Sequence, residues 1–233
     1  MPSTSASGAI ARWRAALGAA ALLVVGVGLG PLGDARSRHL DARAVAVEIW
    51  ADGCDTTPNH GSGVAVGHDL VATVAHLVAG AAGLRVVDDR QRSHRGAIVA
   101  IDTERDVAIV RVDDLDRRRL SLRPLVAGAR GSFYGFGGET PVVASFTIAK
   151  AVSIVSEDIY VRGEHPRPGY QLIADVVAGD SGAGLITDDG ALGGVVWATS
   201  ETTKDRGFAI SASVIADVLA AVGTSSAPSV PCA

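Results

Sequence analysis

Between residues 45 and 197 the sequence is a series of short apolar or alternating runs, separated by glycine, aspartate, asparagine and proline. Such runs predict β-strands. They do not alternate with long helical segments, so a parallel sheet is disfavoured and antiparallel barrels or sandwiches are favoured. The predicted strands are 45–50, 63–66, 70–74, 84–87, 97–101, 107–112, 131–134, 142–155, 159–162, 170–176, 184–186 and 192–197.

One amphipathic helix is predicted near the C-terminus. Ser211 or Ser213 can cap its N-terminus, and apolar residues between positions 214 and 222 lie at helical spacing. Gly223 can end the helix, because glycine readily adopts the left-handed conformation found after helix C-termini.

The segment 117–122, followed by Pro124, is typical of a linker between two halves of a domain. We therefore expect one domain over residues 45–233, with halves at 45–116 and 125–223 and a polar tail at 224–233. A chain of 233 residues with 48% hydrophobic residues can bury a core of this size. Its net charge of −4 has both signs scattered along the sequence, which excludes a basic stripe for nucleic acid.

Residues 1–44 indicate a targeting segment. Arg12 and Arg14 precede an apolar run at 15–32, which a polar stretch follows. The run is longer than the usual signal-peptide core of about 7–15 residues and close to the roughly 20 residues of a membrane span. Two alternatives stay open: a removed signal peptide, or a single anchor that holds the protein to a membrane through 15–32. Either predicts export to the periplasm, the cell envelope or the medium.

In an exported chain the two cysteines, Cys54 and Cys232, predict a disulfide. Because it would close a long loop, the chain-entropy model gives it about 4–5 kcal/mol of stabilisation. The alternative is two unrelated thiols.

The sequence Gly179-Asp180-Ser181-Gly182 lies between two apolar runs. Acyl transfer needs a nucleophile on a tight turn, with backbone N–H groups facing the developing oxyanion, and glycine permits that approach. Ser181 is therefore the candidate nucleophile, and the N–H groups of Gly179 and Ser181 are the candidate oxyanion donors. An ordinary turn is the alternative, since Asp-Ser-Gly is also common turn chemistry.

His76 lies in a small-residue apolar setting, and Asp106 stands at the start of the apolar run 107–112. A buried carboxylate is costly unless it is hydrogen-bonded, and orienting an imidazole satisfies it. Read singly, His76 is a core histidine and Asp106 a strand-end acid. Together with Ser181 they stand in the order His, Asp, Ser along the chain. Subtilisins and α/β-hydrolases place their catalytic residues in other orders.

Three blocks carry a family resemblance: Thr73-x-Ala75-His76, Asp106-x-Ala108-Ile109-Val110 and 179–182, with Gly-Ser-Gly at 61–63 before the first. They resemble the signature blocks of the trypsin-like serine proteases. Within that family the chain is similar, over about 45–232, to the protease domain of actinobacterial membrane-anchored periplasmic proteases linked to acid resistance. Its serine loop departs from the family, because residues 182–185 read Gly-Ala-Gly-Leu where the family commonly has Gly-Gly-Pro-Leu.

The resemblance implies an all-β fold of two six-stranded antiparallel Greek-key barrels with a C-terminal helix. It also implies a serine endopeptidase that acts on proteins or peptides through an acyl-enzyme, with His76, Asp106 and Ser181 as the triad. Asp175, six residues before Ser181, would then stand at the floor of the primary specificity pocket and select Arg or Lys. The alternative is an apolar or small pocket shaped by Thr199 and Phe208.

No metal or organic cofactor is expected, because the other histidines show no ligand spacing. The rival function is a catalytically silent peptide-binding or scaffolding module on a protease fold, since a fold alone does not fix an activity. A hydrolase of small esters would share the acyl chemistry. The sequence leaves the oligomeric state and the activation mechanism open, and Asp180 is expected to need a cationic partner.

Overall fold

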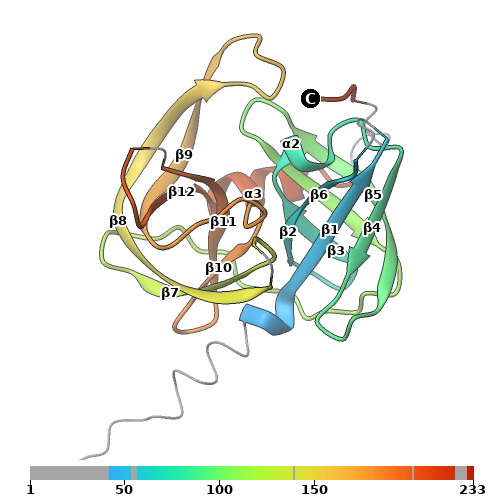
Figure 1. Cartoon of the computed structure of the whole chain (residues 1–233), viewed down its shortest axis with the longest axis horizontal. Coiled ribbons are helices and arrows are strands. Elements are labelled where there is room, and N and C mark those ends of the chain that lie inside the picture. The colour runs from blue at the N-terminus through green and yellow to red at the C-terminus, as the bar shows by residue number, and fades with distance from the viewer. Residues whose placement is uncertain (1–41, 54–56, 139, 201, 224–229) are drawn as a thin grey trace, which may run out of the picture. The chain divides into compact units, whose positions relative to one another are not determined.

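The computed structural model describes residues 42–53, 57–138, 140–200, 202–223 and 230–233 (Figure 1). Helix α2 spans Ala75–Val78 and helix α3 spans Ala212–Ala220. The strands are β1 (Ala46–Asp52), β2 (Asn59–Ala65), β3 (Leu70–Thr73), β4 (Gly83–Val87), β5 (Ser93–Asp102), β6 (Val107–Val112), β7 (Arg130–Gly135), β8 (Val142–Glu157), β9 (Glu164–Ile173), β10 (Gly184–Thr187), β11 (Leu192–Thr199) and β12 (Arg206–Ser211).

Strands β1–β6 form barrel 1, closed in the order β1-β2-β3-β6-β5-β4 with antiparallel neighbours. Along β4 exposed and buried residues alternate before the strand ends, as a barrel wall requires. A register shift between Ile98 and Ala100 bends β5 around the barrel. The interior is filled by aliphatic side chains, among them Val47, Ile49, Val71, Val86, Ala108 and Val110.

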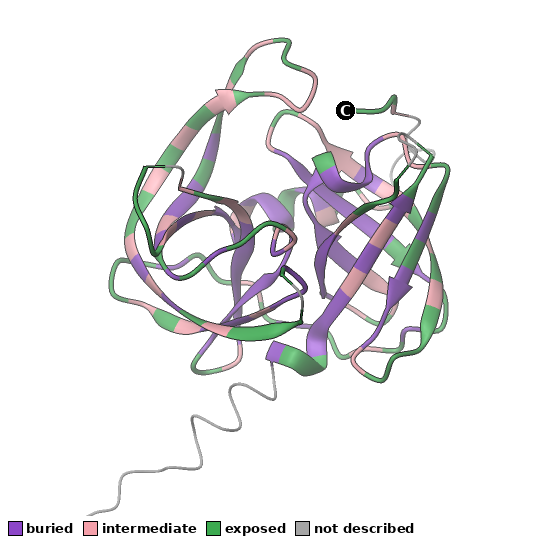
Figure 2. Cartoon of the chain, in the orientation of Figure 1, coloured by how far each residue is buried: buried purple, intermediate pink, exposed green. Residues whose placement is uncertain are grey.

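Strands β7–β12 form barrel 2, closed in the order β10-β11-β12-β9-β8-β7. Its longest pairing is the β8–β9 hairpin, whose far end extends beyond the barrel wall (Figure 1). Its core is more aromatic than that of barrel 1 and includes Phe133, Phe146, Ile148, Tyr170, Leu172 and Leu185. Figure 2 shows buried residues on the inner sides of both barrels and exposed ones along their outer walls.

A third hydrophobic cluster joins the two barrels to α3. Barrel 1 contributes Val64 and Ile109, barrel 2 contributes Val195 and Ile210, and α3 contributes Ile215, all of them buried. The two barrels are therefore fixed against each other by a continuous core, as well as by the linker between them. Fold class, barrel number and C-terminal helix agree with the sequence-based expectation.

The helix prediction also holds in detail. Ser211 has extended backbone angles, and its side chain accepts a hydrogen bond from the N–H of Ser213. Gly223 follows the helix with a φ of 82°, in the left-handed region.

One strand prediction was wrong, and one strand was missed. Residues 159–162 form the turn between β8 and β9, because the Asp158 carboxylate accepts hydrogen bonds from the N–H groups of Tyr160 and Arg162. Strand β12 was not predicted, because its sequence Arg-Gly-Phe-Ala-Ile-Ser carries no clear alternation. The predicted targeting segment lies outside the described residues, except for positions 42–44. None of the helices that the structure describes is long and apolar enough to cross a membrane.

Candidate active site

The barrel 1 topology brings His76 and Asp106 together. Strand β3 ends at Thr73, which pairs with Ala108, the second residue of β6. The segments that leave these two ends are therefore neighbours. His76 lies in α2, directly after β3, and Asp106 directly precedes β6. Asp106 has a φ of 58°, a left-handed conformation that aspartate tolerates better than most residues and that turns its side chain at the strand entrance.

Asp106 holds His76 through both of its carboxylate oxygens. Oδ1 accepts the backbone N–H of His76 at 2.8 Å, and Oδ2 accepts Nδ1 of the ring at 2.7 Å. Because a carboxylate can only accept, Nδ1 carries the proton and the ring is left with Nε2 as its basic nitrogen. Nε2 has no hydrogen-bond partner among the described residues, and the His76 side chain is 41% exposed.

Asp106 is buried, with 3% of the residue exposed. Burial alone would raise its pKa, but hydrogen bonds and charge from His76, with a further hydrogen bond from Trp197, hold the pKa below its ordinary value. Asp106 is therefore ionised at neutral pH and fixes the tautomer of His76.

Ser181 stands on the turn between β9 and β10, in barrel 2. Its hydroxyl donates to the carbonyl oxygen of Trp197 at 3.3 Å. Gly179 precedes it with a φ of +96°, and an added Cβ there would lie 2.8 Å from the Cα of Gly137. The N–H groups of Gly179 and Ser181 donate to no acceptor within the described part of the chain. Both remain available to an incoming oxyanion.

Ser62, in barrel 1, ties the serine turn to that barrel. Its N–H donates to the carbonyl oxygen of Ser181 at 2.9 Å, and its hydroxyl donates to that of Gly179 at 2.7 Å. Gly182 leaves room for this contact, because an added Cβ would lie 2.0 Å from the carbonyl oxygen of Ser62. The sequence pattern singled out the Gly-Ser-Gly run at 61–63 but did not reveal this role.

Among the residues that the structure describes, Asp180 has no cationic partner of the kind that was expected. Its Oδ1 accepts the N–H of Gly137 at 3.1 Å and its Oδ2 accepts the N–H of Val177 at 3.0 Å. Burial raises its pKa above the ordinary value, and these two hydrogen bonds offset only part of that effect. Two backbone N–H groups therefore satisfy this side chain.

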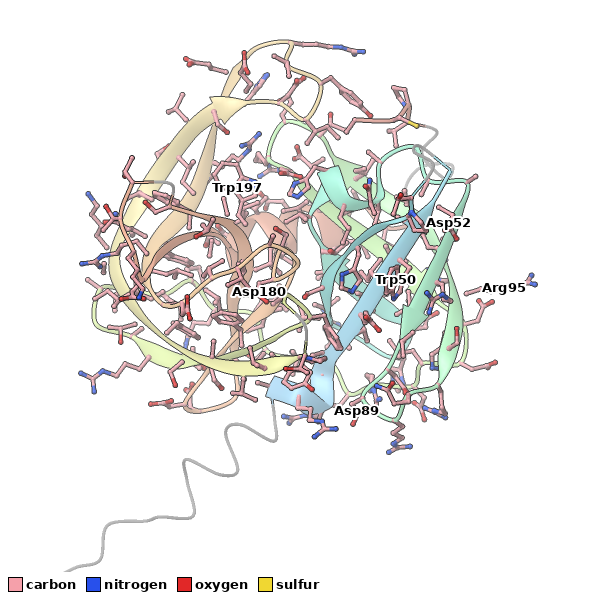
Figure 3. All side chains as sticks on the ribbon, in the orientation of Figure 1. Trp50, Asp52, Asp89, Arg95, Asp180 and Trp197 are labelled. Atoms are coloured by element: carbon pink, nitrogen blue, oxygen red, sulfur yellow. The ribbon has the colours of Figure 1, made fainter. Side chains whose placement is uncertain are left out.

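Trp197 is the residue that sequence reasoning missed. Trp197, labelled in Figure 3, lies on β11. It contacts both Asp106 and Ser181 through the hydrogen bonds described above. A cavity of about 270 Å³ opens beside it and is lined by His76, Asp106 and Trp197. The β8–β9 hairpin also lines this cavity, including the buried Arg167 of β9. The only sequence signal was Trp197 itself, at the end of an apolar run.

The residues proposed for specificity lie on three segments. Thr199 and Phe208 stand on the neighbouring strands β11 and β12, and Asp175 lies exposed on the segment between β9 and Ser181. Beside Asp175, Val176 is 6% exposed, and its Cγ2 lies 2.7 Å from where a Cβ on Gly207 would be.

Cys54 lies outside the described residues, so its bridge to Cys232 stays a prediction. The described residues at or beside the two cysteine positions contact the same loop of barrel 1. The backbone of Cys232 packs against Gly80, and Gly53 packs against Ala82. Among the described residues there is no cluster of three His, Cys, Asp or Glu side chains that could hold a metal ion.

Comparison with known proteins adds to this geometry. Residues 61–195 match the model of the trypsin-like peptidase domain. The serine proteases MT3772 and Rv3671c, from two strains of Mycobacterium tuberculosis, are each 32% identical to the chain over 167 residues. That match covers 70% of this chain and 42% of each relative, so the chain spans less than half of their length.

Solved structures agree with the fold. The active form of the Rv3671c protease from M. tuberculosis superposes with a TM-score of 0.77 at 28% identity, covering 85% of this chain and 90% of that one. An inactive form of the same protease gives 0.70 at 29% identity, covering 80% and 93%. The serine endoprotease from Yersinia pestis, at 20% identity and a TM-score of 0.65 over 80% and 64%, shares the fold. The chain therefore belongs to the family of trypsin-like serine peptidases.

Proposed function

We propose that this protein is an exported serine endopeptidase whose triad consists of His76, Asp106 and Ser181. The observation that carries the proposal is the double hydrogen bond from His76 to the buried Asp106, which leaves Nε2 of the ring unpaired beside a cavity. The two unpaired N–H groups of Gly179 and Ser181 supply the second requirement of acyl transfer.

In the reaction, the Ser181 hydroxyl leaves the Trp197 carbonyl, to which it holds by a long hydrogen bond, and turns toward Nε2 of His76. Contacts of this kind tighten only when substrate binds. Oγ forms a bond to the peptide carbonyl carbon while its proton passes to Nε2, and the oxyanion accepts the N–H groups of Gly179 and Ser181. Collapse breaks the C–N bond, and His76 returns the proton to the leaving amine. Water then repeats these steps on the acyl-enzyme and regenerates Ser181.

For the residue on the acyl side of the scissile bond, the contacts favour a small or apolar side chain. An exposed carboxylate such as Asp175 pairs only weakly with a cation in water. Val176, which is buried, faces β12 at Gly207 instead.

Export is the expectation from residues 1–44 and from the predicted disulfide, which an oxidising compartment favours. The same segment accounts for membrane association through residues 15–32 if it is retained. The substrates are proteins or peptides, as the family implies.

A fluorophosphonate probe tests the proposal, because only an assembled triad makes a serine reactive. We expect the wild-type protein to be labelled and to cleave a peptide library, and the Ser181→Ala protein to do neither while unfolding at the same temperature. Undiminished cleavage by Ser181→Ala would refute the assignment.

One observation favours the rival function, a catalytically silent peptide-binding module: the Ser181 hydroxyl donates to Trp197 and not to His76. This module would bind peptides but remain unlabelled in the same experiment. A protein that reacts with the probe and cleaves nitrophenyl esters but no peptide would instead be an esterase.

A further inference from the structure

We propose that Trp197 is a positioning residue of this active site, and that its indole N–H holds the Asp106 carboxylate in the orientation that serves His76. The inference rests on the proposed function and deepens it. Nε1 of Trp197 donates to Oδ2 of Asp106 at 2.7 Å. The carbonyl oxygen of the same residue accepts the Ser181 hydroxyl at 3.3 Å. Trp197 thus contacts residues from both barrels.

The position of the indole on the carboxylate matters. Oδ2 accepts Nδ1 of His76 and Nε1 of Trp197 at the same distance of 2.7 Å, while Oδ1 is occupied by the backbone N–H of His76. All three donors are needed because Asp106 is 3% exposed and cannot replace one of them with bulk water. Without the indole, one buried oxygen would lose a donor, and the carboxylate would be free to rotate away from Nδ1.

Arg167 strengthens this contact from the far side. It is 1% exposed, and its guanidinium carbon lies 5.0 Å from the centre of the Trp197 ring. The guanidinium N–H groups of Arg167 donate to the carbonyl oxygens of Glu104 and Glu157 and to the Ser156 hydroxyl. A cation over an indole face is attracted to the π-electrons and makes the N–H a stronger donor. The ring is therefore held between a buried cation and a buried anion.

Trp50 supplies a matched control within the same chain. The guanidinium carbon of Arg85 lies 5.0 Å from its ring centre, as Arg167 does from Trp197. The difference is the acceptor: Nε1 of Trp50 has no hydrogen-bond partner among the described residues. Replacing each tryptophan with phenylalanine weakens a similar ring–cation contact, but only at position 197 does it remove a donor to a carboxylate.

The test measures the labelling rate with a fluorophosphonate, and kcat and KM for a cleaved peptide, in the wild type and in the Trp197→Phe and Trp50→Phe variants. Hydrogen bonds to charged groups imply a loss of about 10- to 100-fold in kcat and in labelling rate for Trp197→Phe. KM should change little, since the contact acts on Asp106. Trp50→Phe should match the wild type. Equal kcat values for all three proteins would overturn the inference.

A second variant separates the donor from the shape of the ring. Benzothienylalanine at position 197 keeps the two fused rings but has sulfur in place of the N–H. We expect it to lose as much activity as Trp197→Phe, and full activity would overturn the inference.

The proton NMR signal of Nδ1–H in His76 provides a readout that does not depend on turnover. It should shift in Trp197→Phe and stay in place in Trp50→Phe, because only the first variant removes a donor from Oδ2 of Asp106. An unchanged signal would overturn the inference. If the wild type is not labelled, the proposed function fails, and this signal still decides whether Trp197 positions Asp106.

Discussion

Asp88 is the buried charge whose removal should most clearly change stability. It directly follows β4, is fully buried, and accepts hydrogen bonds from the N–H groups of Arg90 and Arg92 at 2.9 Å each. The Arg92 side chain adds two more hydrogen bonds, and Arg117, in the linker between the barrels, adds another at 3.3 Å. Nε2 of His94 lies 3.5 Å from Oδ2 of Asp88. This cluster anchors the start of the linker to barrel 1.

The pKa of Asp88 gives the magnitude. Burial would raise it, but the hydrogen bonds from Arg92 and Arg90 lower it from 3.8 to about 2. A difference of about 1.8, at about 1.36 kcal/mol for each pKa unit, corresponds to about 2.4 kcal/mol. Because the folded pKa is depressed, this stabilisation is complete above the ordinary pKa and is lost as the pH falls toward 2.

Urea denaturation of Asp88→Asn in a Ser181→Ala background, which prevents self-cleavage, tests this. At pH 7 the free energy of unfolding should fall by about 2 kcal/mol, and the difference from the parent should shrink between pH 4 and pH 2. Asp69→Asn is the control, because Asp69 is half-exposed in its ion pair with Arg111 and should cost less than about 1 kcal/mol. A loss at pH 2.5 as large as that at pH 7 would refute the reasoning.

Three further predictions concern the candidate site and the chain ends. Asp106→Asn should lower kcat about 10,000-fold through the wrong His76 tautomer, measured by peptide turnover; a larger loss in Asp102→Asn would mean that the acid lies four residues earlier. A free-thiol count on the unreduced, denatured protein should be near zero, and two titratable thiols would exclude the Cys54–Cys232 bridge. The cleavage profile on a peptide library should be unchanged by Asp175→Ser. Loss of a preference for Arg or Lys in this variant would instead support a charged specificity pocket.

Much of the fold could be predicted from the sequence, because barrel strands in this chain are short, bounded by turn residues and buried on one side. The run 107–112 coincides with β6, and 70–74 overlaps β3, so the two neighbours that position the candidate triad were both found. The capped helix followed from Ser211 and Gly223 for the same local reasons.

What the sequence did not reveal depends on contacts between distant segments. Trp197 lies 91 positions from Asp106 along the chain, so no local pattern links the two. Arg167 stands in a polar stretch typical of a surface, yet it is 1% exposed because acceptors from the β5–β6 turn and from β8 converge on it. The sequence led us to expect a cationic partner for Asp180. Two backbone N–H groups take this role instead by donating to its carboxylate, and a sequence does not show such backbone contacts.

The polar contacts between the barrels converge on the candidate site. Ser62 of barrel 1 binds both carbonyl oxygens of the serine turn, while Asp106 of barrel 1 accepts the indole of Trp197 in barrel 2. Separating the barrels would therefore break the support of Ser181 and that of Asp106 in a single step. The third hydrophobic cluster, which joins both barrels to α3, opposes that separation by keeping apolar side chains from water. Docking of the barrels and assembly of the proposed triad should therefore be coupled, and we expect a substitution in this cluster to reduce peptide turnover before it unfolds either barrel.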